Sequence, residues 1–142
     1  MQRVLLNIKG TQREGDSNEC IELTTEGRLS KKPEGLLIEY DESELTGIEG
    51  CTTTLVLKDN CVTMERKGTL SMQMEFAPGR VFNSNLSTPY GTINLHVFAS
   101  RVESELKESE GRLCLEYELS MDSLSTFNKL DLSFKNMEDC IN

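Results

Sequence analysis

The sequence predicts an all-β protein, an antiparallel meander closed into a β-barrel of eight to ten strands. Three observations predict this class. Apolar and polar residues alternate along nearly the whole chain, in short runs that end at turn signals. These turn signals recur about every ten residues, a spacing typical of sandwiches and barrels. The face opposite each apolar face is polar, as an antiparallel sheet with one solvated side requires.

The expected strands are read from their apolar faces, which show a period of two residues. In chain order these faces are Val4/Leu6/Ile8, Ile21/Leu23, Leu36/Ile38/Tyr40, Leu55/Leu57, Val62/Met64, Leu70/Met72/Met74/Phe76, Ile93/Leu95/Val97, Leu113/Leu115/Tyr117/Leu119 and Leu130/Leu132/Phe134. Weaker strands are expected near residues 80–86 and 99–106, for a total of nine or ten. A large open sheet tends to curl or split, and closure removes its edges, so we expect a barrel rather than a sandwich.

Two local features need separate interpretation. The segment from Arg101 to Gly111 could form a helical turn, but we interpret it as a strand end followed by exposed loop. The reason is that Arg101 is out of phase with Val97, which indicates a β-bulge between them. The turn Thr88-Pro89-Tyr90-Gly91 has a fixed geometry, and its tyrosine is a candidate to cap one end of the barrel.

The turn at Asp59-Asn60 allows one strand register to be predicted. A two-residue hairpin loop there defines which residues face each other. The facing pairs on one face are then Leu57–Val62, Leu55–Met64 and Thr53–Arg66. Because the first two pairs are apolar, this face points to the interior, and Arg66 projects inward with it. The same register puts Cys51 and Cys61 at opposite ends of the hairpin, too far apart to form a disulfide.

Length, charge and termini limit the classes of function. A chain of 142 residues predicts one domain, residues 1–142. The formal net charge of −9 argues against binding to nucleic acids and to anionic membrane surfaces. No signal peptide and no apolar run of membrane-spanning length occur in the sequence, so we expect a cytoplasmic protein.

No catalytic or metal-binding pattern is found, so the sequence predicts a protein that is not an enzyme and has no cofactor. The five cysteines include no C-x-x-C pair, which argues against a zinc site. The single histidine, His96, is expected on the outer face by its parity with Leu95 and Val97. Acidic pairs such as Glu116/Glu118 are expected on the solvated face, where a convex wall offers no cleft for hydrolysis.

Several motifs follow one another in a specific order. They are Leu36-x-Ile38-x-Tyr40-x-Glu42, Gly47, Thr53-Thr54, Arg66-x-Gly68, Met74-x-Phe76-x-x-Gly79, Thr88-Pro89-Tyr90-Gly91 and Gly111-x-Leu113-x-Leu115-x-Tyr117. The ordered set resembles the YwiB-like family of uncharacterised bacterial β-barrel proteins, found mainly in Firmicutes. The resemblance covers roughly residues 2–136 and implies a lipocalin-like, or calycin, barrel. It implies no activity and no catalytic residues. Unlike secreted lipocalins the chain has no Trp, so transport of a secreted ligand is not implied.

The candidate ligand-binding residues are those expected on the inner face with unusual chemistry. They are Arg66, Tyr40, Tyr117, Met72 and Met74. Arg66 either contacts a carboxylate or phosphate of a ligand or lies near a barrel end, satisfied by the protein itself. The tyrosines and methionines either line a pocket or belong to an ordinary core.

These residues lead to two hypotheses of function. The first is a non-enzymatic barrel that binds a small, partly apolar molecule in its interior, with Arg66 available for an anionic group. The second is a protein–protein interaction module, or a homodimer, that uses exposed apolar residues such as Phe98 or Phe127. The first hypothesis requires an interior that is not completely filled by side chains.

Overall fold

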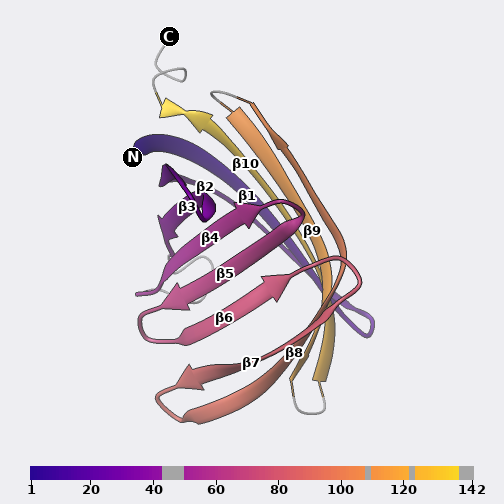
Figure 1. Ribbon diagram of the computed structural model, residues 1–142. Helices are drawn as coiled ribbons and strands as arrows, with labels where there is room; N and C mark the ends of the chain where they lie inside the picture. Colours follow the sequence, from indigo (N-terminus) through magenta and orange to yellow (C-terminus); the bar gives the residue numbers. More distant parts are fainter. Residues whose placement is uncertain (43–49, 108–109, 122–123, 138–142) are drawn as a thin grey trace.

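Ten strands follow one another in the computed structural model, which describes residues 1–42, 50–107, 110–121 and 124–137 (Figure 1). They are β1 (Gln2–Glu14), β2 (Ser17–Lys32), β3 (Gly35–Asp41), β4 (Thr52–Lys58), β5 (Cys61–Lys67), β6 (Ser71–Phe76), β7 (Val81–Thr88), β8 (Gly91–Leu106), β9 (Glu110–Met121) and β10 (Leu124–Asn136). Each strand pairs with its neighbours in the sequence, and β10 pairs with β1 to close the barrel. The prediction of a closed antiparallel meander is therefore confirmed.

The strands differ in length in a way that shapes the barrel. Five neighbouring strands, β8, β9, β10, β1 and β2, have 12 to 16 residues, whereas β3 to β7 have 6 to 8. Figure 1 shows the long strands sweeping along one side, with the short ones stacked opposite. The long strands therefore form most of the wall at the end where the cavity lies.

The hairpin register predicted around Asp59-Asn60 is confirmed. Leu57 pairs with Val62, and Thr53 pairs with Arg66. Asp59 has a positive φ of 56°, as tight hairpin turns favour for Asp or Asn. The Arg66 guanidinium consequently enters the barrel from the inner face of β5.

Strand β8 is longer than expected and contains the predicted β-bulge. The apolar run from Ile93 and the strand expected at 99–106 are a single strand, β8. The register against β9 shifts between Ala99 and Arg101, which is the expected β-bulge. The bulge restores the pairing phase, so a change of parity here marks a kink rather than the end of a strand.

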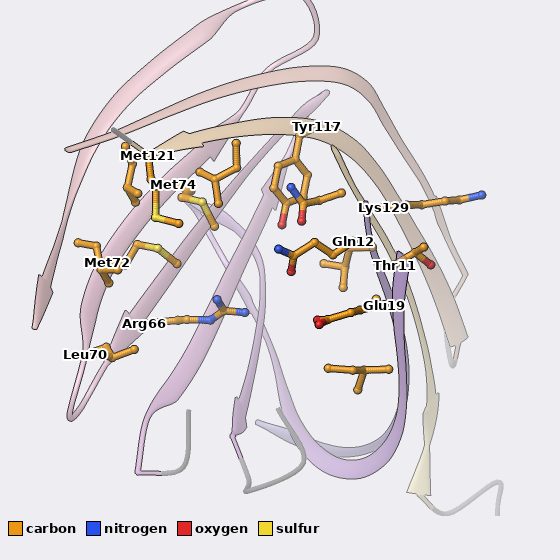
Figure 2. A pocket seen from close by; sticks show the side chains of 17 residues that line it. Thr11, Gln12, Glu19, Arg66, Leu70, Met72, Met74, Tyr117, Met121 and Lys129 are labelled. Atoms are coloured by element: carbon orange, nitrogen blue, oxygen red, sulfur yellow. The ribbon is translucent and has the colours of Figure 1, made fainter. Parts of the chain in front are cut away.

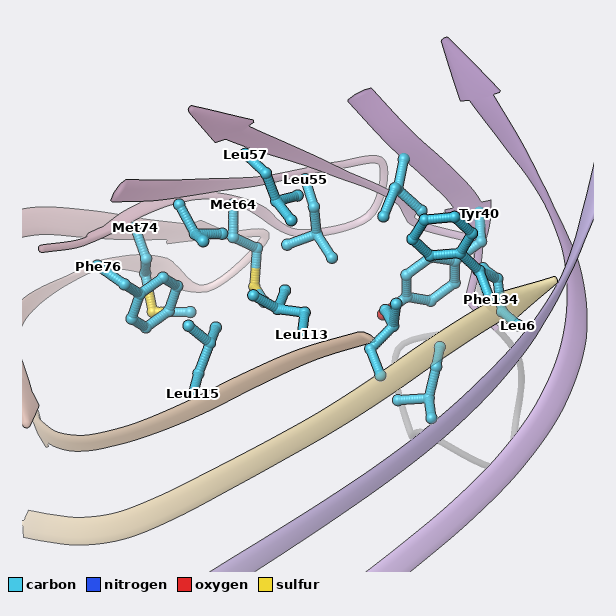
Figure 3. Packing of buried hydrophobic residues seen from close by; sticks show 14 of the residues in the cluster. Leu6, Tyr40, Leu55, Leu57, Met64, Met74, Phe76, Leu113, Leu115 and Phe134 are labelled. Atoms are coloured by element: carbon cyan, nitrogen blue, oxygen red, sulfur yellow. The ribbon is translucent and has the colours of Figure 1, made fainter. Parts of the chain in front are cut away.

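The apolar core fills one end of the barrel. Its fully buried members come from nearly every strand and include Val4, Leu6, Ile38, Leu55, Met64, Phe76, Leu113, Leu115 and Leu132 (Figure 3). The ring of Phe76 packs on Tyr117 with centroids 4.7 Å apart. A tilted pair of aromatic rings stabilises the fold beyond its buried area, here at the boundary between core and cavity.

The structure changes one expectation about the barrel ends, the capping role of Tyr90. Tyr90 is 99% exposed and caps nothing, because its turn extends into solvent. In the part of the chain described, no helix is long and apolar enough to cross a membrane. Within the same residues, no group of three or more His, Cys, Asp or Glu side chains could hold a metal ion.

Candidate ligand-binding cavity

A cavity of about 350 Å³ occupies the end of the barrel that the core leaves unfilled (Figure 2). It lies where the inner faces of β1, β9 and β10 pass beyond their buried leucines and meet β5 and β6. A smaller cavity of about 210 Å³ adjoins it and reaches β3. The larger volume is within the range of small-molecule sites, and the smaller one is below it; both exceed the usual space of a buried water many times.

One wall of the larger cavity is apolar. Met72 and Met74 project from β6, and Figure 2 shows both side chains facing the space. The wall is completed by Leu70, Leu86, Leu95, Leu119 and Met121. Methionine side chains adapt to ligands of different shape, so this wall favours an apolar group without demanding one outline.

The opposite wall carries the polar groups. Tyr117, predicted as a site residue, lines it as expected from its inward parity, and Arg66, also predicted, extends toward it from β5 beside its pairing partner Met72 (Figure 2). Gln12, Glu19 and Asn128 also line it and were not predicted. They are cross-strand neighbours: Gln12 on β1 pairs with Glu19 on β2 and with Asn128 on β10. Extending the inward faces of β1, β2 and β10 by one or two further inward positions, at a period of two residues, finds all three.

Arg66 is held by a short network with Thr53 and Glu42. Its Nε donates to the Thr53 hydroxyl at 3.3 Å, and that hydroxyl donates to Glu42 Oε1 at 2.6 Å. The Arg66 Nη2 lies 3.8 Å from the same carboxylate oxygen. Arg66 thus has the protein partner that one interpretation expected. Its guanidinium also lines both cavities, so contact with a ligand stays a prediction.

Glu42 is the buried charge that the sequence reasoning missed. Its side chain is only 1% exposed, and its Oε2 makes no hydrogen bond with any described residue. It directly follows β3, and its inward parity with Ile38 and Tyr40 was the available signal. A buried carboxylate needs a partner, and here Arg66 and Thr53 supply it at Oε1, with the Tyr40 hydroxyl close enough to interact with the same carboxylate.

Tyr40 lies in the smaller cavity rather than the larger one. The ring is buried, and burial is the first cause that raises the pKa of its hydroxyl; the nearby Glu42 carboxylate raises it further. Burial also raises the pKa of Tyr117, although the Arg66 charge opposes this. Both tyrosines therefore remain protonated donors and acceptors at neutral pH.

These raised pKa values predict an alkaline weakening of the fold. A folded-state pKa above the ordinary 10.0 means that the folded chain holds protons that the unfolded chain releases. The contribution of these tyrosines to the free energy of unfolding is therefore fully present below about pH 10 and is lost as the pH rises further. Spectrophotometric titration should show less phenolate in the native protein than in the urea-unfolded chain at the same pH. Equal titration of all three tyrosines in both states would contradict the burial of Tyr40 and Tyr117.

Gly10 forms the junction between the two cavities. It lines both, together with Ile21, Arg66 and Leu130. A Cβ at this position would meet no atom within 4 Å. A glycine inside a strand therefore leaves open space beside the Arg66 guanidinium, so that the polar end of the larger cavity continues towards Glu42.

The outer face of the barrel carries His96 and the acidic pairs that were expected there. His96 is exposed, and its ring contacts Asn83 on the neighbouring strand. The outward acids are paired at the surface: Glu39 with Arg28 at 2.9 Å, and Glu116 with Arg101 at 3.5 Å. The described cysteines, Cys20, Cys51, Cys61 and Cys114, are free thiols. Cys140 lies outside the described residues.

Comparisons with known proteins agree with this architecture. The uncharacterized β-barrel protein YwiB of Bacillus subtilis (strain 168) is 22% identical over 117 residues, 82% of this chain and 80% of the relative. The crystal structure of the ywiB protein from Bacillus subtilis superposes with a TM-score of 0.85 at 18% identity, covering 95% of this chain and 92% of that one. This structural likeness shows the fold. The resemblance drawn from the ordered motifs is confirmed, because residues 6–132 match a family described as Domain of unknown function (DUF1934), and the chain belongs to it.

Proposed function

We propose that this protein is a non-enzymatic, cytoplasmic barrel that binds a small amphipathic molecule in its interior. One observation carries the proposal: Arg66 lines a cavity of about 350 Å³ together with methionine and leucine side chains, which include its own pairing partner Met72. An apolar wall facing a few polar groups is the usual composition of a small-molecule site. The site residues are Arg66, Tyr117, Met72 and Met74, with Tyr40 in the adjoining cavity.

The barrel architecture supports the same proposal by analogy. Barrels of about this size can hold one small ligand in their interior. We propose that this one binds a ligand in the same way as the lipocalin-like, or calycin, barrels. A fold does not by itself imply a function, so the weight of the proposal rests on the cavity and its charged residue.

Filling the cavity tests the proposal. We expect native mass spectrometry of the gently purified protein to show a bound mass, which solvent extraction then identifies. Gly10→Leu should abolish that mass and keep the fold, because a Cβ at this position meets no atom within 4 Å and the residue lines the cavity that the longer side chain would fill. Lys9→Leu, which adds leucine on the outer face of the same strand, is the matched control and should keep the ligand. A bound mass that persists in Gly10→Leu would place the ligand elsewhere.

A second function is favoured by two exposed aromatic residues. Phe98 on β8 and Phe127 on β10 both pair opposite Glu118 of β9, so they flank it on the outer face. The Arg13 guanidinium lies 5.2 Å from the Phe127 ring centroid. Such a row suits contact with another protein or a second copy of the chain. In the same experiment, a clean apo mass at monomer or dimer weight would favour this function over ligand binding.

A further inference from the structure

The unpartnered oxygen of Glu42 indicates what a ligand has to supply. Its Oε1 already accepts from Thr53 and faces Arg66, whereas Oε2 is buried with no donor among the described residues. Glu42 lines the smaller cavity, and Gly10 leaves the way from the larger cavity open. A buried carboxylate oxygen without a donor is costly, so a group that donates a hydrogen bond there would be stabilised.

The charges at the cavity junction limit the head group further. Arg66 and Glu42 face each other at 3.8 Å, longer than a hydrogen-bonded ion pair. A purely anionic head at Arg66 would add a second carboxylate-like charge beside Glu42, with Glu19 also on the cavity wall. A purely cationic head at Glu42 would lie beside the Arg66 guanidinium. Either ligand adds net charge to a partly desolvated site, which is unfavourable.

We propose that the head group of the ligand is zwitterionic, with an anionic acceptor next to an ammonium donor, on an apolar tail. This inference rests on the proposed function and names its ligand class. The anion of the head faces Arg66, and the ammonium faces Glu42 Oε2. The four charges then alternate, so that no net charge is added to the interior. The tail extends from the junction along the methionine and leucine wall.

Three probes with one tail and different heads test the charge requirement. They are octanoate, heptylamine and α-aminooctanoate, and isothermal titration calorimetry measures their dissociation constants with the wild-type protein. We expect α-aminooctanoate to bind at least about tenfold more tightly than either single-charge probe, a difference that corresponds to about 1.4 kcal/mol. Octanoate or heptylamine binding as tightly as the zwitterion would overturn the inference.

Glu42→Gln supplies the second arm, because it removes the charge that the ammonium requires and keeps the size of the side chain. The preference for α-aminooctanoate over octanoate should then disappear, and octanoate should bind more tightly than to wild type. An unchanged order of the three constants in a folded Glu42→Gln protein would count against the proposal. If the variant does not fold, the wild-type order decides alone.

The proposed function and this inference can fail separately. A ligand recovered by native mass spectrometry and displaced by Gly10→Leu, but carrying a head of one charge only, would leave the barrel a binding protein and refute the zwitterion. Absence of any bound mass, together with no calorimetric signal from the three probes, would refute both.

Discussion

Arg66→Met is expected to lower the free energy of unfolding by about 3 kcal/mol, because it leaves the Glu42 carboxylate buried without its cation. The Glu42 side chain is 1% exposed, so its carboxylate is shielded from bulk water, whereas Arg66 itself is 26% exposed. This partial exposure places the expected loss at the lower end of the range for broken buried pairs. Urea unfolding followed by circular dichroism measures the loss.

Lys67→Met is the matched control for this prediction. Lys67 lies beside Arg66 on β5, and its ammonium is 2.8 Å from Glu65, a shorter ion-pair distance than that of Arg66. Its side chain is 78% exposed, however, so removing it should change stability by less than about 1 kcal/mol. A loss as large as that of Arg66→Met would show that burial is not the cause.

A double substitution separates the buried charge from lost packing. Adding Glu42→Gln to Arg66→Met removes the unpaired negative charge, so we expect it to recover a measurable part of the lost stability. Two independent effects would instead add up, and the double variant would be the less stable one. Such additivity would mean that Arg66 stabilises the barrel through its side-chain contacts rather than through Glu42.

Gly68→Ala is expected to destabilise the protein by about 3 kcal/mol or more, through two costs at one position. Gly68 has a φ of +147°, which side chains rarely adopt. A Cβ there would also lie 2.1 Å from the Gly50 carbonyl oxygen and 2.8 Å from the Cys51 Cα. Both contacts are with backbone, which cannot rotate away as a side chain can. Thermal unfolding measures the loss.

Gly79→Ala separates these two costs. Gly79 also has a positive φ, +75°, but a Cβ there meets nothing within 4 Å. The variant therefore bears the conformational cost alone, which we expect to be about 1 kcal/mol. Equal losses at Gly68 and Gly79 would contradict the steric part of the argument.

Much of the inner surface could be predicted from the sequence, because a strand has a strict period of two. Once Leu55, Leu57, Val62 and Met64 define the inner face, the pairing across Asp59-Asn60 requires Arg66 to point inward, as observed. The same parity placed Tyr117, Met72 and Met74 around one space. It does not predict Gln12, Glu19 and Asn128, because polar residues at the end of an apolar run look like the end of the inner face.

The sequence by itself determined the strands, the faces of most side chains, the inward direction of Arg66 and the family. Only the tertiary structure decided that Glu42 is its partner and that a cavity lies beside them. Pairing in a meander is local, so each hairpin can be read from its own residues. The Arg66–Glu42 contact instead spans three consecutive strands around Thr53, and the space beside Gly10 depends on closure of β10 on β1 and on how side chains from several strands fill the interior. Packing of that kind depends on volumes summed across the whole barrel, and a pattern along one strand does not contain it.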